Sequence, residues 1–186
     1  MYDEQKYIEQ NESKEIIDNV FEYYKKEYSP LTDHWQKLPY DALSFIREQE
    51  RIALLEKDTG IQVKDKRVLN VGSGIGSFDI AMQKYGADIY GIEPDDLEYA
   101  IAIKRIENKG LKCNIQNAVG EKLPFTDDFF DLVTSFQVME HVQNPSEVIK
   151  EMVRVTKKNG IIYINMPNHN SFWEGHYGCF WWPHFY

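Results

Sequence analysis

The feature that most constrains the fold is a short apolar run that ends in a glycine-rich turn. Val68-Leu69-Asn70-Val71 leads into Gly72-Ser73-Gly74-Ile75-Gly76, and a helix-like segment follows. A second strand-like run, 88–92, delivers Glu93 at its end. Glycines let a backbone approach a ligand closely, and a carboxylate beyond the next strand can accept two hydrogen bonds from a ribose diol. These features predict a nucleoside-binding site.

The spacing of the glycines argues against a dinucleotide. The dinucleotide fingerprint is G-x-G-x-x-G, and its third glycine lies where helix and strand pack closely. Counted from Gly72 that position is Ser77, and counted from Gly74 it is Asp79, whose charge would oppose a nearby pyrophosphate. The G-x-G-x-G pattern here suits a nucleoside without phosphates. A tight turn that binds no ligand is the alternative, which Glu93 makes less attractive.

Composition excludes several other classes of protein. The chain has 186 residues, 42% of them hydrophobic, which is enough for one domain with a real core. A net charge of -9 with scattered Lys and Arg argues against a nucleic-acid partner. Cys113 and Cys179 are too few for a disulfide framework or a metal cluster, and we expect reduced thiols. No membrane-spanning run and no basic-then-apolar leader is visible, so we expect a cytoplasmic protein without a membrane partner.

Strands and helices are predicted to alternate from Arg67 onward. The expected strands are 67–71, 88–92, 111–116, 131–136 and 161–166, and the expected helices are 75–85, 95–108 and a helix starting at Pro145. That last helix has Asn144 as N-cap, Glu147 completing a capping box and Gly160 as its stop. This alternation predicts a parallel sheet with right-handed crossovers.

The first 66 residues are expected to be helical. In the first helix, which should end at Ser29-Pro30, one face carries an apolar stripe, with further apolar residues beside it: Ile17, Phe21, Tyr24 and Tyr28, then Ile16, Val20 and Tyr23. Asp41 is the expected cap of a second helix that carries Phe45, Ile52 and Leu55. We therefore expect an N-terminal helical cap over 1–66, a core over 67–168 and an aromatic tail over 169–186.

Five motifs in order give the core a family resemblance. They are V-L-N-V-G-S-G-I-G, I-E-P, N-A-V-G-E-K-L-P-F, F-D-L-V-T-S-F-Q-V-M-E-H-V and E-M-V-R-V-T-K-K-N-G-I-I-Y-I. Together they resemble the class I S-adenosylmethionine-dependent methyltransferases, in particular a small-molecule branch (type 11-like), over about residues 67–168. The resemblance implies a Rossmann-like α/β fold with strand order 3-2-1-4-5 and S-adenosylmethionine as cofactor.

The resemblance also implies roles for individual residues. Gly72, Gly74 and Gly76 would line the methionine and ribose parts of the cofactor, Glu93 would bind both ribose hydroxyls, and Pro94 would lie against the adenine. Asn117 and Ala118 would contact the adenine edge, and Phe136 either touches the methionine arm or packs in the core. Asn70 and Asn117 stand where the family often has aspartate, so a charge near the cofactor's ammonium is lost at Asn70.

The segment Gln137-Val138-Met139-Glu140-His141 carries the candidate catalytic residue. Some quinone-biosynthesis O-methyltransferases have E-x-x-E-H here and bind a divalent cation, but glutamine occupies the first position in this chain. We therefore expect no metal. His141 is a candidate general base, and the alternative is that Glu140 and His141 belong to a structural hydrogen-bond network.

The end of the chain departs from the family. Class I methyltransferases usually add two antiparallel strands beside strand five, and residues 167–186 leave no room for both, so that hairpin is expected to be missing or incomplete. An open edge strand favours association, either as a homo-oligomer or with a partner chain. The aromatic tail would form a substrate wall, an interface or stranded core: His169, Trp173, His176, Tyr177, Phe180, Trp181, Trp182 and His184.

Three functions follow from these expectations, in order of preference. The first is S-adenosylmethionine-dependent methyl transfer to a small-molecule or carrier-linked sugar acceptor. The second is a catalytically incomplete cofactor-binding module that needs a partner chain. The third, a nicotinamide-dependent reductase, is disfavoured by Ser77 and Asp79.

Overall fold

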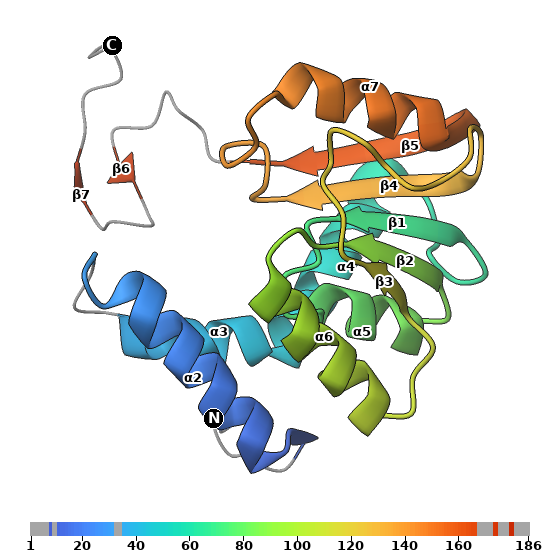
Figure 1. The fold of residues 1–186 in the computed structure, drawn as a ribbon. Coiled ribbons are helices and arrows are strands. Elements are labelled where there is room, and N and C mark those ends of the chain that lie inside the picture. Colours follow the sequence, from blue (N-terminus) through green and yellow to red (C-terminus); the bar gives the residue numbers. More distant parts are fainter. Residues whose placement is uncertain (1–7, 9–10, 32–34, 167–172, 175–178, 181–186) are drawn as a thin grey trace.

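A five-stranded parallel sheet forms the centre of the molecule (Figure 1). The computed structural model describes residues 8, 11–31, 35–166, 173–174 and 179–180. The strands lie in the order β3-β2-β1-β4-β5, which confirms the predicted fold class. Their bounds are Arg67–Val71 (β1), Asp88–Ile92 (β2), Asn114–Gln116 (β3), Phe130–Phe136 (β4) and Thr156–Asn165 (β5). Consecutive order reverses between β1 and β4, where ligands bind in folds of this kind.

Alternating side chains of the strands build a core on each face of the sheet. Val68 of β1 packs with α4 (Phe45–Thr59) and α5 (Ser77–Lys84) on one face, whereas its neighbour Leu69 packs with α7 (Pro145–Val155) on the other. The remaining core helix, α6 (Asp96–Asn108), packs against α5 and β3. The central strands β1 and β4 are buried on both faces over most of their length, as is usual in a parallel sheet.

The N-terminal helices pack beside the carboxyl ends of the strands. They are α2 (Lys14–Tyr28), the short 3-10 helix η1 (Trp35–Lys37) and α3 (Leu38–Leu43). The fully buried residues of α2 are Ile16 and Val20, with Ile17 and Tyr24 partly buried, so the buried stripe lies one residue away from the predicted one. Asp41 lies inside α3 and caps nothing. Instead, the Ser44 hydroxyl caps α4 by accepting the Arg47 amide hydrogen at 3.2 Å.

The junction between α7 and β5 differs from the prediction. Asn144 caps α7 by accepting the Glu147 amide hydrogen, but the Asn144 amide donates to Glu121, not to Glu147. The helix ends at Val155 and β5 begins at once, so Gly160 lies within the strand. A β-carbon at Gly160 would lie 2.7 Å from Thr156 Cγ2 and 3.1 Å from the Asp131 carbonyl oxygen. The ladder shifts register opposite this segment, between Phe130 and Leu132. The glycine therefore permits a bulge and does not stop the helix.

Two short strands follow the sheet. Trp173–Glu174 (β6) and Cys179–Phe180 (β7) pair with each other in antiparallel fashion and form a sheet of their own. Within the described ranges β5 has one strand neighbour, so its outer edge is open in this part of the chain. The side chains of the aromatic tail lie outside the described residues, and their expected role stays a prediction. None of the helices described here is long and apolar enough to cross a bilayer.

Candidate functional site

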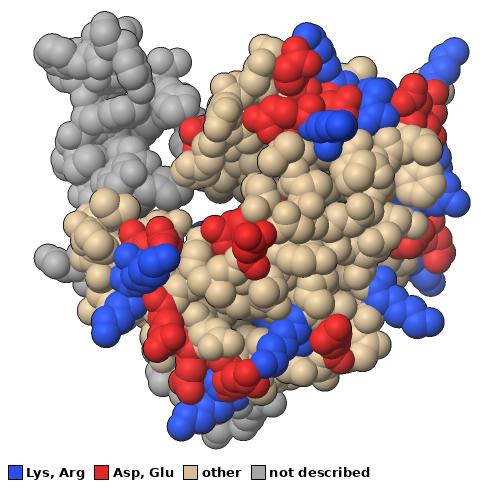
Figure 2. All heavy atoms as spheres, viewed as in Figure 1, with Lys and Arg blue, Asp and Glu red and all other residues tan. Residues whose placement is uncertain are grey.

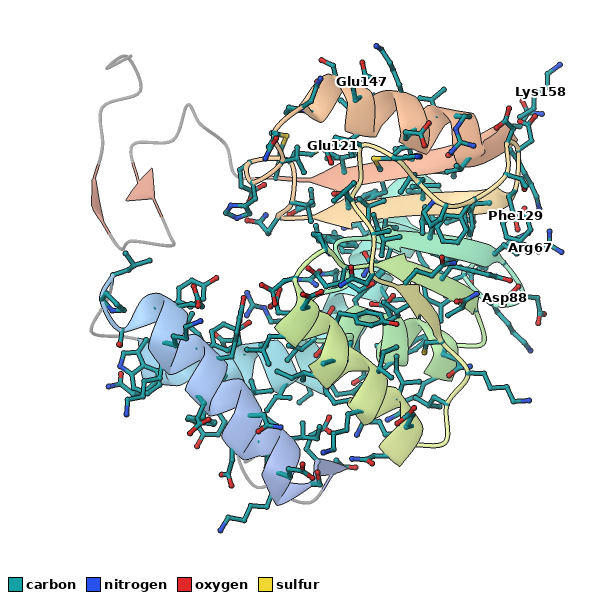
Figure 3. All side chains as sticks on the ribbon, in the orientation of Figure 1. Arg67, Asp88, Glu121, Phe129, Glu147 and Lys158 are labelled. Carbon is teal, nitrogen blue, oxygen red and sulfur yellow. The ribbon has the colours of Figure 1, made fainter. Side chains whose placement is uncertain are left out.

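A cleft of about 1340 Å³ opens at the carboxyl ends of β1, β2 and β4. Its floor is the glycine-rich turn after β1, with Glu93 and Pro94 after β2 and Phe136 to Val138 at the end of β4. Tyr23, Tyr24 and Tyr28 of α2 form the opposite wall. Figure 2 shows the hollow with acidic side chains beside it, and Figure 3 places Arg67, Asp88 and Phe129 at the far end of the sheet from Glu121 and Glu147.

The glycine-rich turn needs its glycines for two different reasons. All three alternating glycines adopt positive φ, at 86° for Gly72, 51° for Gly74 and 78° for Gly76. A β-carbon at Gly72 would overlap the Val138 side chain, and one at Gly76 would lie 3.1 Å from the β-carbon of Ala102 in α6. Gly72 and Gly74 line the cleft, whereas Gly76 instead allows close packing of α6. The three residues predicted to contact cofactor therefore separate into two that face the cleft and one that supports it.

The Glu93 carboxylate is fixed at the floor of the cleft. Its Oε2 accepts the Gly74 amide hydrogen at 2.7 Å, its Oε1 accepts the Asp95 amide hydrogen at 2.9 Å, and the residue is 5% exposed. Burial raises its pKa, while the two amide donors act in the opposite direction. Each carboxylate oxygen can accept a further hydrogen bond, so the group is oriented in advance to receive a diol.

Beneath the turn, Asp79 organises a buried polar cluster. The Asn70 amide donates to Asp79 Oδ2 at 3.0 Å, the Ser73 hydroxyl donates to Oδ1 at 3.2 Å, and Thr134 donates to Asn70 Oδ1 at 3.3 Å. Asn70 lines the cleft, but these bonds engage its side-chain amide inside the protein. Asp79 is fully buried beneath the turn, so its charge does not face a docking ligand as the sequence argument assumed. Its structural role is to support the turn.

Burial of Asp79 makes a testable contribution to stability. Desolvation raises the pKa of its carboxyl from 3.8 to about 7. The folded protein keeps this proton up to about pH 7, whereas the unfolded chain releases it near pH 4. We expect the Asp79 contribution to the free energy of unfolding to fall by up to about 1.4 kcal/mol per pH unit across that window.

Urea unfolding between pH 4 and pH 7 checks this expectation by difference. The wild-type protein should lose more stability over the window than Asp79→Asn, whose side-chain amide keeps an acceptor for Asn70 and does not titrate. Taking the difference cancels the parallel contribution of Glu98, whose pKa burial also raises to about 7. Equal slopes for the two proteins would contradict a proton held by Asp79 in the folded state.

Glu98 is a cleft residue that the sequence analysis missed. It lies in the first turn of α6, and its Oε1 comes within 3.8 Å of a β-carbon built on Gly74. Burial raises its pKa, and the neighbouring charges of Glu93 and Asp95 add to the effect, while a hydrogen bond with Tyr23 of α2 lowers it. A short acidic cluster after β2 (Glu93, Asp95, Asp96, Glu98) was the only available signal. The sequence cannot show that Glu98 faces the cleft, because this depends on α2, whose Tyr23 lies across the cleft and hydrogen-bonds with Glu98.

The end of β4 carries the predicted methionine contact and the candidate base. The Phe136 ring lines the cleft and also packs at 4.8 Å from Phe78, with the Arg51 guanidinium 4.8 Å above it. The packing alternative is confirmed, and contact with the methionine arm stays a prediction. Gln137 has a positive φ of 56°, and its side-chain amide donates to Asn165 at 2.8 Å. This conformation is uncommon for a non-glycine residue, and it occurs here where the chain leaves β4 along the cleft.

His141 lies at the mouth of the cleft. Its side chain is 70% exposed, and its Nε2 lies 4.0 Å from Glu140 Oε1. Both Glu140 carboxylate oxygens are buried and lack a hydrogen-bond partner among the described residues. This arrangement gives no support to the structural hydrogen-bond network considered for the two residues.

The predicted adenine contacts are only partly brought to the cleft. Pro94 lines it, but Asn117 and Ala118 lie outside the lining, which is formed by the next residues, Val119 to Glu121. The Asn117 side chain donates to Asp96 at 2.9 Å. The loop after β3 therefore lines the cleft through Val119 to Glu121 and not through the two residues that the sequence singled out. Its contact with adenine stays a prediction.

The polar groups beside the glycine-rich turn fit a cationic nucleoside. Glu93 can accept from a ribose diol, and the turn's glycines leave room for a ligand against the backbone. Glu93 and Glu98 lie beside Gly74, so the acidic groups gather next to the turn and disfavour a pyrophosphate there. Arg47 and Arg51 also line the cleft. The fold and this site define a Rossmann-like nucleoside-binding protein.

The family model described as a methyltransferase domain matches residues 69–164. The chain belongs to the class I S-adenosylmethionine-dependent methyltransferases, whose cofactor is S-adenosylmethionine.

Similar proteins support the same family. A Mycolicibacterium gilvum protein named as an uncharacterized methyltransferase is 33% identical over 64% of this chain and 45% of its own length. A ubiquinone biosynthesis O-methyltransferase from Pseudomonas fluorescens is 31% identical over 61% of this chain and 49% of its own length. This chain therefore spans about half the length of these curated relatives.

Solved structures agree on the fold. The YcgJ protein of Bacillus subtilis is 26% identical with a TM-score of 0.55, over 61% of this chain and 50% of that one. Phosphoethanolamine N-methyltransferase 2 of Haemonchus contortus, solved with S-adenosylhomocysteine, has a TM-score of 0.59 at 22% identity, over 63% and 28% of the two chains. At that identity the second likeness shows the fold alone.

Proposed function

We propose that this chain binds S-adenosylmethionine in the cleft and transfers its methyl group to a small-molecule or carrier-linked sugar acceptor. The observation that carries the proposal is the orientation of Glu93. Backbone amides of Gly74 and Asp95 hold its carboxylate at the end of β2, beside the glycine-rich turn, where it can accept hydrogen bonds from a ribose diol. When bound, the cofactor supplies an electrophilic methyl group on a sulfonium.

The residues of the floor would then bind and orient the donor. Glu93 would accept from both ribose hydroxyls, Gly72 and Gly74 would lie against the ribose and methionine parts, and Pro94 would lie against the adenine; all four residues line the cleft. Phe136 closes the methionine side, held in place by Phe78 and Arg51. Direct displacement needs donor and acceptor in line and within contact, so the rigid floor contributes by positioning.

His141 is the proposed general base for an acceptor hydroxyl or amine. It lines the cleft beyond Phe136, at the opposite end of the floor from Glu93. The Glu140 carboxylate lies 4.0 Å from His141 Nε2, so an acidic group stands beside the proposed base. The name of the Pseudomonas relative, an O-methyltransferase of ubiquinone biosynthesis, supports a hydroxyl on a small molecule as acceptor.

Calorimetric titration tests the first part of this proposal. We expect saturable binding of S-adenosylmethionine and of its demethylated product, S-adenosylhomocysteine, and no competition from NAD, whose pyrophosphate would meet the carboxylates of the cleft. Incubation with methyl-labelled cofactor and a panel of hydroxylated metabolites and nucleotide sugars then tests transfer. Absence of binding at millimolar cofactor would end the proposal, and binding without transfer to any acceptor would leave a cofactor-binding module.

A further inference from the structure

The N-terminal segment is joined to the glycine-rich turn by a buried ion pair. Arg105 of α6 is 2% exposed, and its Nε and Nη2 donate to Glu12 Oε1 at 3.2 and 2.8 Å. Lys109 Nζ lies 3.1 Å from the same oxygen. Both basic residues are more than ninety positions from Glu12 in the chain, and the Glu12 side chain is only 7% exposed. Removing one partner of a buried ion pair strongly destabilises the folded protein, because the other charge is left buried without compensation.

The same guanidinium also reaches the turn itself. Arg105 Nη1 donates to the Ile75 carbonyl at 2.6 Å and to the Ser77 hydroxyl at 2.8 Å. Ser77 in turn donates to the Ala42 carbonyl of α3. Ile75 lies between two glycines with positive φ, and its carbonyl belongs to the peptide plane that joins it to Gly76, within the turn that carries Gly74.

Apolar packing couples the same elements. The Ile75 side chain is 4% exposed and belongs to one buried cluster with Ile16 and Val20 of α2, Leu43 of α3 and Ile101 of α6. The turn is therefore held at three points: the Ile75 side chain, the Ile75 carbonyl and the Ser77 hydroxyl. Residues of the N-terminal segment contribute to the contacts at each point. A free strand-to-helix turn would need none of these contacts.

We propose that Arg105 is a positioning residue for the cofactor site, and that Glu12 directs it. In this view the described part of residues 11–43 belongs to the binding machinery, because docking of Glu12 orients the guanidinium that holds the Ile75 carbonyl. Cofactor affinity then depends on a contact that does not touch the cofactor. The inference rests on the proposed function for its affinity readout, and on the structure alone for its exchange readout.

Two variants and one matched control test the proposal. Arg105→Lys keeps the positive charge but cannot reach Glu12, Ile75 and Ser77 together, and Glu12→Gln removes the charge that directs the guanidinium. Glu15→Gln is the control, because the Glu15–Lys104 pair joins the N-terminal segment to α6 at the surface and does not touch the turn. We expect the first two variants to weaken binding of S-adenosylhomocysteine about tenfold and the control to change it less than twofold.

Amide hydrogen exchange gives a readout that a general loss of stability would not reproduce. In folded Arg105→Lys and Glu12→Gln, the amides of Gly74 to Ser77 should exchange faster while those of β4 and α7 keep their protection. In wild-type protein at low urea, the turn should lose protection in the same step as α2, which covers the case in which the variants do not fold. A turn that stays protected after α2 opens would overturn the proposal.

The outcomes separate this inference from the proposed function. If wild-type protein binds no S-adenosylhomocysteine, the function fails, and exchange alone decides on the turn. If wild-type protein binds and the folded Arg105 and Glu12 variants bind equally well, the positioning role is wrong and the function stands.

Discussion

Replacing Glu93 by alanine is expected to weaken binding of S-adenosylhomocysteine about 100-fold or more, because two charge-assisted hydrogen bonds to ribose are lost. The structure adds a second reason. The Glu93 carboxylate also accepts hydrogen bonds from the Gly74 and Asp95 amides at 2.7 and 2.9 Å. Its removal therefore frees both the turn and the start of α6. Calorimetry with S-adenosylhomocysteine measures the loss directly.

Two controls isolate the ribose contact. Glu121→Gln also removes a carboxylate from the cleft lining, and we expect it to change the dissociation constant less than about threefold, since it lies on the loop beside the start of α7. Adenine alone lacks the diol, so Glu93→Ala should weaken its binding far less than it weakens the binding of S-adenosylhomocysteine. A folded Glu93→Ala protein with wild-type affinity would exclude the proposed ribose site.

The elements that the sequence predicted best are those fixed by local pattern. Strands 67–71 and 88–92 agree residue for residue with β1 and β2, because short apolar runs bounded by charges and glycine leave one register. The boundary at Gly160 failed because a glycine that permits a bulge has the same appearance in a sequence as one that ends a helix. Likewise Glu147 has the spacing of a capping box, but Glu121, distant in sequence, takes its place.

The residues of the candidate site could be predicted where each directly follows a predicted strand. Gly72, Gly74, Glu93 and Pro94 follow directly from two strand ends, and the structure brings them to one cleft. Glu98, Tyr23 and the Arg105–Glu12 pair were missed because their roles depend on how the N-terminal helices lie on the core. Contacts between segments about 75 to 93 residues apart leave no periodic signal in a single sequence.

Gly91 is the other position where a single change should have a large effect. It lies in the middle of β2, between Asn70 of β1 and Ile115 of β3, and it is buried. A β-carbon there would overlap the Ser73 hydroxyl and lie 2.7 Å from Asp79 Oδ1. The absent side chain therefore makes room for the polar cluster that supports the glycine-rich turn.

We expect Gly91→Ala to lower the free energy of unfolding by about 3 kcal/mol, combining overpacking with the loss of the Ser73–Asp79 hydrogen bond. For a domain of this size that corresponds to a fall in melting temperature of roughly 6 to 12 °C. Urea denaturation and calorimetric melting measure it. The fraction that remains folded should also bind S-adenosylhomocysteine more weakly, since Ser73 must move.

A compensating change tests the cause. Ser73→Ala alone removes one hydrogen bond and should cost about 1 kcal/mol. In Gly91→Ala/Ser73→Ala the hydroxyl that meets the new methyl group is gone, so the double variant should be more stable than Gly91→Ala alone, although contact with Asp79 persists at 2.7 Å. The two residues are in contact, so the free energies should not add. If they do add, the loss in Gly91→Ala does not come from Ser73, and the place of Gly91 beneath the turn would need another explanation.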